Sequence, residues 1–230
     1  MNSFSKSSRD YRDSNTIQKL VADEVLRRSP TKGDRVIDLG AGDGEIFRQL
    51  DWNLNIFSAI DISEEMLNLH PQDNRVSKFV GSFDSQDSWN FIENQKPNLL
   101  LSSSSFQWSN NIERLFRRVK KLNIPFSIAI FTSKTFNELH NYFDIESPIY
   151  SKDKLISYSK IFDKNIDLDI QSYQLEFNSS RELLKHIKNS GVSGNLNRVS
   201  PKILKEFIRE EPLKKLSFEV LYINSKVIEI

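Results

Sequence analysis

The chain has 230 residues, with 32 Lys and Arg against 31 Asp and Glu, so its formal charge at neutral pH is +1. This length suits one sizeable α/β domain, and the balanced charge argues against nucleic acid as the main partner. The absence of cysteine excludes disulfides, thiolate catalysis and cysteine-based zinc sites, and three histidines leave little for any other metal site.

The N-terminal stretch MNSFSKSSRDYRD is polar and lacks the apolar segment of a signal peptide. No run of about 18 apolar residues occurs anywhere in the chain. We therefore expect a cytoplasmic protein with no membrane partner, and we expect it to act as a monomer.

The first half of the chain alternates between strand-like and helix-like patterns. Apolar residues at helical spacing predict a first helix over residues 15–28. Short apolar runs bounded by turn residues predict strands at 35–40, 55–63, 75–81, 97–105 and 126–133. Further helices are predicted at 44–50, 63–69 and 110–122. This alternation is typical of parallel βαβ units, so we predict an α/β protein with a mostly parallel, doubly wound sheet.

The pattern changes after Ser133. Two amphipathic helices, at 134–143 and 151–162, follow each other with no strand between them, so we predict a helical lid insertion over 134–164. The remaining elements are predicted as a strand at 168–177, helices at 179–191 and 200–211, and a closing strand at 216–223. We treat residues 1–230 as one domain, in which residues 1–30 form an N-terminal helical cap.

The stretch DLGAGDG (38–44) joins the first predicted strand to a helix and holds three glycines spaced two apart. It lacks the G-x-x-x-x-G-K-[ST] pattern of a P-loop and the G-x-G-x-x-G spacing of a dinucleotide turn. Glycine lets the backbone adopt positive φ and pass close to a ligand. Asp38 and Asp43 would repel phosphate but could accept hydrogen bonds from an ammonium group. A tight turn with no ligand stays open as the alternative.

Asp61 ends the second predicted strand, about 20 residues after Gly40, where a carboxylate can accept both hydroxyls of a ribose. In a doubly wound sheet, ligands bind at this edge, near the point where the strand order reverses. A ligand with a ribose and an amino-acid end but no phosphate fits these features. The sequence therefore predicts S-adenosylmethionine as the cofactor and S-adenosylhomocysteine as its product.

The residues RVIDLGAGDG…AIDISEEML resemble the class I S-adenosylmethionine-dependent methyltransferases. Other segments resemble one family among them, the malonyl-carrier-protein O-methyltransferases of biotin synthesis (the BioC family). These segments are SSSSFQWSNN (102–111), FTSKTFNELHNYF (131–143) and LLKHIKNSGVSG (183–194). Tyr11 and Gln18 also match positions in the family's leading helix. The resemblance covers most of the chain and implies a Rossmann-like fold with an antiparallel C-terminal strand.

The resemblance also implies roles for individual residues. Tyr11 and Trp108 would be the catalytic residues, facing the transferred methyl group and the acyl group. The residues implied at the cofactor are Gln18, Asp38, Gly40, Ala41, Gly42, Asp61, Ile62, Met66, Ser82, Phe83 and Ser103. No metal is implied, and the histidines carry no assigned role.

The chain departs from the family pattern in three places. Gly81-Ser82-Phe83-Asp84 stands where Gly-Asp is usual, so the adenine amino group could bond to Ser82, Asp84 or the backbone. The usual Pro-Gly-Gly turn before the fifth strand is absent. No arginine occurs in the predicted lid to meet a substrate carboxylate, and the lysines that could replace it are Lys134, Lys152 and Lys154.

The implied reaction is methylation of the free carboxyl group of a malonyl thioester on acyl carrier protein, in the pimeloyl part of biotin synthesis. An acidic carrier would dock on a basic helix face. Two such faces are available, formed by Arg114, Arg117, Arg118, Lys120 and Lys121, and by Lys202, Lys205, Arg209, Lys214 and Lys215. Two alternatives stay open: methylation of another small carboxylic acid of the aconitate kind, and a methyltransferase-like binding subunit without catalysis.

Overall fold

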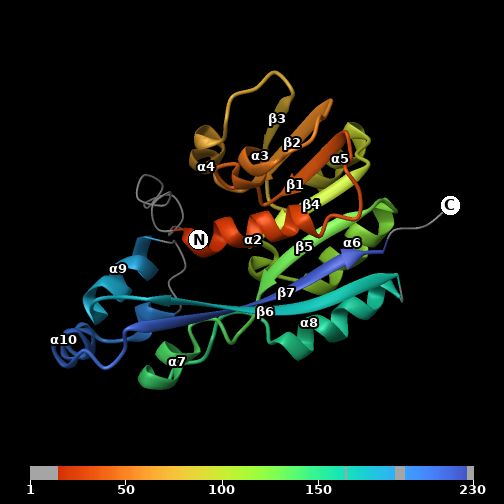
Figure 1. Cartoon of the computed structure of the whole chain (residues 1–230). Coiled ribbons are helices and arrows are strands. Elements are labelled where there is room, and N and C mark those ends of the chain that lie inside the picture. Colours follow the sequence, from red (N-terminus) through yellow and green to blue (C-terminus); the bar gives the residue numbers. More distant parts are fainter. Residues whose placement is uncertain (1–14, 164, 190–194, 227–230) are drawn as a thin grey trace.

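The computed structural model describes residues 15–163, 165–189 and 195–226 (Figure 1). They form a seven-stranded sheet in the order β3-β2-β1-β4-β5-β7-β6. The strands that pair in parallel are β1 (Arg35–Leu39), β2 (Ile56–Asp61), β3 (Val76–Val80), β4 (Leu99–Ser103) and β5 (Phe126–Phe131). β7 (Lys215–Ser225) runs antiparallel to β5 and to the edge strand β6 (Ile166–Glu176). The predicted α/β sheet with an antiparallel C-terminal strand is confirmed.

Helices pack on both faces of the sheet. The first set is α2 (Thr16–Arg27), α3 (Glu45–Gln49), α4 (Glu64–Leu69), α7 (Asn137–Phe143), α9 (Ser180–Asn189) and α10 (Pro201–Glu210). Buried side chains of this set share a core with Val36 and Phe57. The second set is α5 (Gln86–Gln95), α6 (Ile112–Leu122) and α8 (Lys152–Ser159), which share a core with Ile37 and Leu39. Successive side chains of a strand point to opposite faces, so β1 contributes to both cores.

α6 illustrates why these segments become helices. The side chain of Asn111 caps it by accepting the backbone N–H of Arg114 at 2.9 Å, and the chain leaves the helix at Asn123, whose φ is +52°. Its buried face consists of Ile112, Leu115, Phe116 and Val119. Each such side chain contributes about 1.5–3 kcal/mol when it leaves water, so the amphipathic pattern determines which face meets the sheet.

The sequence interpretation missed one helix, α5. Ser85 caps it by accepting the backbone N–H of Ser88 at 3.3 Å, and Trp89 and Ile92 are buried in the second core. The spacing of Trp89 and Ile92 is helical, but the segment carries few other apolar residues. The capping serine was therefore the clearest signal available in the sequence.

The connection between β5 and β6 contains α7 and α8, in the region predicted as a helical lid. α8 lies against α6, and Leu155 is buried in the second core. Phe162, in the short helix η2 (Lys160–Phe162), has its ring 5.2 Å from the ring of Phe116. Part of this region therefore covers the sheet, and movement of the region as a lid stays a prediction.

Within the described residues, no helix combines the length and the apolar character needed to span a membrane.

Candidate cofactor and substrate site

The strand order reverses between β1 and β4, and the glycine turn lies at the carboxyl end of β1. The backbone N–H of Gly40 donates to the carbonyl of Ile60 at 2.8 Å, which joins the turn to β2. The hydroxyls of Ser102 and Ser105 donate to the carbonyl of Leu39 at 2.7 and 2.9 Å, which joins it to the end of β4. The ends of three strands thus form one fixed rim, where ligands of doubly wound sheets bind.

Gly40 and Gly42 lack a side chain for different reasons. Gly40 has φ +85°, and a Cβ there would lie 2.2 Å from the Cβ of Ser105, so packing within the protein excludes a side chain. Gly42 has φ +55°, and a Cβ there would approach only the Cε of Met66, at 3.6 Å. The described protein leaves room beside Gly42, which fits a ligand that passes close to the backbone.

Asp61 lies at the end of β2, and its carboxylate is held in a fixed orientation. Oδ2 accepts the backbone N–H of Gly42 at 2.8 Å, and Oδ1 accepts that of Ser63 at 2.8 Å. Burial raises the pKa of Asp61, while these backbone donors act in the opposite direction. Each oxygen keeps a further lone pair, so the carboxylate can still accept two ribose hydroxyls.

Asp38 is 1% exposed, and neither carboxylate oxygen has a hydrogen-bond partner among the described residues. Burial raises the pKa of Asp38 well above its usual range, and the negative charge of Asp61 adds to this effect. Buried polar groups are nearly always paired, so this carboxylate fits an ammonium group that a ligand brings to the turn. Asp43 differs, because Arg48 pairs with its carboxylate at 3.0 Å.

Three apolar residues were predicted beside the adenine or near it, and they differ in exposure. Ile62, directly after Asp61, is 57% exposed, whereas Met66 is buried. Phe83 is half-buried, with its ring 5.7 Å from the ring of Phe106. An exposed isoleucine directly after Asp61 could pack against the flat face of a purine, as the resemblance implies, and contact of these residues with adenine stays a prediction.

The unusual segment after β3 is tied to the segment after β4. Ser82 Oγ accepts the backbone N–H of Asp84 at 3.1 Å. The carboxylate of Asp84 accepts the hydroxyl of Ser109 at 2.8 Å and the backbone N–H of Asn110 at 2.9 Å. Asp84 therefore already connects two loops of the site, which leaves Ser82 and the backbone as the freer groups for an adenine.

Arg118, in α6, binds the same segment through its guanidinium group. Its guanidinium donates to the carbonyls of Asp84 and Ser85, both at 3.0 Å, and to the carbonyl of Phe83 at 3.4 Å. It also lies 5.5 Å from the ring centroid of Trp89. Sequence reasoning placed Arg118 on an exposed docking face, and the structure instead uses its planar fork within the protein.

The segment after β4 borders a cavity of about 510 Å³. Gln107 and Trp108, in the short helix η1 (Phe106–Trp108), line it together with residues 148–151 and Lys154. Ser103, predicted at the cofactor, is the last residue of β4. The structure thus places Trp108 beside the carboxyl edge of the sheet, and its contact with an acyl group stays a prediction.

Gln18 lies in the first turn of α2. Near the other end of α2, the carbonyl of Val25 accepts the hydroxyl of Ser127 at 2.8 Å, and Ser127 lies at the start of β5. At a rise of 1.5 Å per residue, Gln18 is on the order of 10 Å farther along the helix, away from that end. This orientation agrees with a position near the crevice. Tyr11 lies outside the described residues, and its role stays a prediction.

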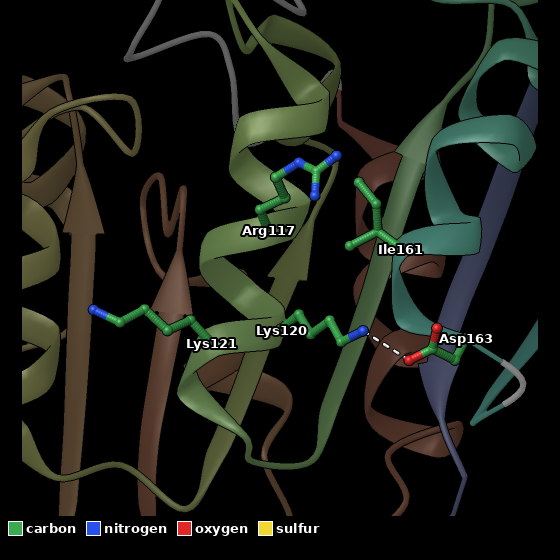
Figure 2. Close-up of a pocket in the computed structure, with 5 residues that line it drawn as sticks. All are labelled: Arg117, Lys120, Lys121, Ile161 and Asp163. Carbon is green, nitrogen blue, oxygen red and sulfur yellow. Dashed lines mark hydrogen bonds and ion pairs between the residues drawn. The ribbon is translucent and has the colours of Figure 1, made fainter.

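A second hollow, of about 600 Å³, is lined by basic residues of α6 (Figure 2). Arg117, Lys120 and Lys121 line it, and each already has a carboxylate partner; Lys120, for example, pairs with Asp163 at 2.7 Å. Figure 2 shows Lys121 pointing away from the other two cations. These residues lie in the second half of α6, whereas its first residue, Ile112, follows the segment that connects β4 to α6.

No protein-family model matches the chain. A curated relative from Bacillus cereus, named malonyl-[acyl-carrier protein] O-methyltransferase, is 26% identical over 203 residues, which cover 78% of this chain and 74% of that protein. A relative of the same name from Chlorobium phaeovibrioides is 25% identical over 210 residues, with 83% and 78% covered.

Two solved structures with a similar fold are methyltransferases by name. A putative methyltransferase from Bacillus halodurans matches with a TM-score of 0.60 at 10% identity, covering 90% of this chain and 98% of that chain. The plantazolicin methyltransferase BpumL, solved with S-adenosylhomocysteine, matches with a TM-score of 0.52 at 12% identity, covering 96% and 89%. The fold is therefore that of the Rossmann-like methyltransferases.

Proposed function

We propose that the chain is an S-adenosylmethionine-dependent O-methyltransferase that methylates the free carboxyl group of malonyl-acyl carrier protein. The observation that carries the proposal is the pair of carboxylates at the glycine turn. Asp38 is buried and unpartnered among the described residues, which suits an ammonium group, and Asp61 is oriented to accept hydroxyls. The names of the curated relatives indicate the acceptor.

The residues at the rim fit the proposed cofactor. Asp38 would hold its ammonium group, Asp61 its ribose and Ile62 its adenine, while Gly42 gives the backbone room for close approach. The residues proposed to complete its surroundings are Gln18, Gly40, Ala41, Met66, Ser82, Phe83 and Ser103. A bound cofactor would supply an electrophilic methyl group to the acceptor oxygen. The carbon–sulfur bond would break as the carbon–oxygen bond formed, and its electron pair would stay on sulfur.

The chain's own task is positioning and desolvation. A carboxyl group titrates near 4, so the acceptor is ionised at neutral pH and no general base is needed. The protein must hold one carboxylate oxygen in line with the methyl group and exclude water from it. Trp108, and Tyr11 in the segment before α2, are proposed to face the reacting groups. We further propose that one copy of the chain suffices and that it acts in the cytoplasm.

The proposal is tested by supplying labelled S-adenosylmethionine with malonyl-acyl carrier protein, with acetyl-acyl carrier protein, or with free aconitate. We expect label on the malonyl carrier alone, as an ester that mild alkali releases. Label on free acids alone would instead identify a methyltransferase of small carboxylic acids. Cofactor binding without transfer to any acceptor would identify a binding subunit.

A further inference from the structure

We propose that the cavity beside Trp108 receives the acyl end of the substrate and that Lys154 supplies the positive charge that binds its free carboxylate. This inference rests on the proposed function. It adds a residue for substrate selection that the family resemblance leaves open, because the arginine expected in the lid is absent from residues 134–164.

The cavity lies where an acceptor would need to be. Its wall includes Gln107 and Trp108, which follow Ser105, and Ser105 donates its hydroxyl to Leu39 at the start of the glycine turn. The opposite wall is fixed as well, because the backbone N–H of Ser133 donates to the carbonyl of Tyr150 at 2.9 Å. The cavity therefore lies at the ends of β4 and β5, next to the glycine turn that is proposed to bind the cofactor.

The charge of Lys154 is positioned without being neutralised. Its Nζ lies 5.1 Å from the ring centroid of Tyr150 and 5.9 Å from that of Tyr158. The hydroxyl of Tyr150 donates to the carbonyl of Ser109 at 3.4 Å, which holds the ring against the rim. Aromatic faces attract an ammonium group but carry no net charge, so Lys154 can still bind an anion. No carboxylate of the described residues forms an ion pair with it.

The structure also distinguishes among the three lysines that the sequence offered. Lys154 lines the cavity, whereas Lys134 and Lys152 do not. The basic hollow on α6 is a weaker candidate for an anion, because its three cations already pair with carboxylates. Position and an uncompensated charge thus coincide only at Lys154 among these candidates.

Gln107 gives an independent sign that the cavity takes a ligand. This residue is 4% exposed, and its Nε2 donates to the carbonyl of Ser104 at 2.6 Å, which fixes the orientation of the amide. Its Oε1 is left without a hydrogen-bond partner among the described residues. An acceptor of this kind fits a substrate that carries N–H groups next to its acyl end, as the amide-containing arm of a thioester carrier does.

The test compares Lys154→Gln, Lys154→Arg and the control Lys152→Gln, a change on the same helix outside the cavity. Calorimetry measures binding of malonyl-pantetheine and of acetyl-pantetheine, which lacks the carboxylate, in the presence of S-adenosylhomocysteine. A hydrogen bond to a charged group is stronger than one between neutral groups. We therefore expect Lys154→Gln to weaken binding of malonyl-pantetheine about tenfold or more, with a matching rise in KM for malonyl-acyl carrier protein.

We expect acetyl-pantetheine binding and S-adenosylhomocysteine affinity to be unchanged in Lys154→Gln, and malonyl binding to be largely kept in Lys154→Arg and Lys152→Gln. Equal malonyl binding by wild type and Lys154→Gln would overturn the inference, as would an equal loss for both pantetheine probes. The proposed function is judged separately, because methyl transfer by the wild type tests it without any variant.

Discussion

The carboxylate of Asp61 accepts the backbone N–H of Gly42 at 2.8 Å. This bond connects the end of β2 to the turn that follows β1, and these two strands are neighbours in the sheet. The proposed ribose contact and the proposed close approach to the backbone therefore belong to one structural unit. Changes at either residue should weaken cofactor binding while the rest of the fold stays in place.

Replacing Asp61 with Asn should lower the affinity for S-adenosylhomocysteine by between about tenfold and about a hundredfold, because hydrogen bonds to a charged acceptor contribute roughly 1.5–3 kcal/mol. Titration calorimetry measures the change. The matched control is Asp51→Asn, since Asp51 is an exposed carboxylate whose ion-pair partner among the described residues is Lys32, at 3.3 Å. Equal affinity of the Asp61 variant and wild type would remove Asp61 from the site.

Alanine at Gly42 and alanine at Gly40 should have different effects. At Gly42 the new methyl group would make only an ordinary contact with Met66, so we expect a loss of about 1–2 kcal/mol in unfolding free energy from the positive φ, together with clearly weaker cofactor binding. At Gly40 the methyl group would collide with Ser105, so we expect severe destabilisation. Denaturant unfolding and calorimetry separate the two outcomes. Full cofactor affinity in Gly42→Ala would contradict a ligand beside this residue.

Asp38 should lower the unfolding free energy of the ligand-free protein and should increase the affinity for the cofactor. Its folded-state pKa is raised well above 3.8, so the folded protein holds this proton to higher pH than the unfolded chain does. The unfolding free energy therefore falls as pH rises through that window. Asp38→Asn should be more stable than wild type at about pH 7.5, and the difference should shrink toward about pH 5.

Thermal melting without ligand measures this difference, and Asp43→Asn provides the contrast. Asp43 forms an ion pair with Arg48, so its replacement should lower the melting temperature, not raise it. Asp38→Asn should also bind S-adenosylhomocysteine more weakly than wild type. A variant of Asp38 that is less stable than wild type and binds the cofactor equally well would refute the role assigned to this carboxylate.

Arg118 should act as a positioning residue for the loop after β3. Arg118→Lys keeps the charge but loses the planar fork that meets the carbonyls of Asp84 and Ser85, so we expect S-adenosylhomocysteine affinity to fall severalfold. Arg117→Lys is the control, since the partner of Arg117 within the described part of the chain is Glu113, in an exposed ion pair at 2.7 Å. Reversing the charges of Arg117 and Arg118 together would affect loop support and any carrier docking at the same time, so the two roles could not be separated. Unchanged affinity in Arg118→Lys would contradict the positioning role and would favour Arg118 as part of a docking face.

The strands and the glycine turn could be predicted from short local patterns in the sequence. Most of the parallel strands are short apolar runs, and the glycine spacing predicted the turn between β1 and α3. α5 was missed because only a few of its side chains are apolar. Within the described residues, Asp43 forms an ion pair and Asp38 does not, because Arg48 lies next to Asp43. The contacts of Arg118 depend on which backbone carbonyls face α6. Such contacts join residues far apart in the chain, so periodicity cannot predict them.

The position of Lys154 in the proposed substrate site could likewise not be predicted from the sequence. The sequence offers three lysines in one region, and no pattern distinguishes them. The structure does so through Tyr150 and Tyr158, which place the ammonium of Lys154 at a cavity wall. The tyrosines are recognisable in the sequence, but their arrangement around one lysine requires the folded chain.

The most direct test of the account is equilibrium dialysis of the purified chain against labelled S-adenosylmethionine. We predict close to one equivalent bound per chain, displaced by S-adenosylhomocysteine but not by a nicotinamide dinucleotide. Failure to retain the label, or equal displacement by the dinucleotide, would contradict the proposal that Asp38 and Asp61 form a site for a ribose and an ammonium group.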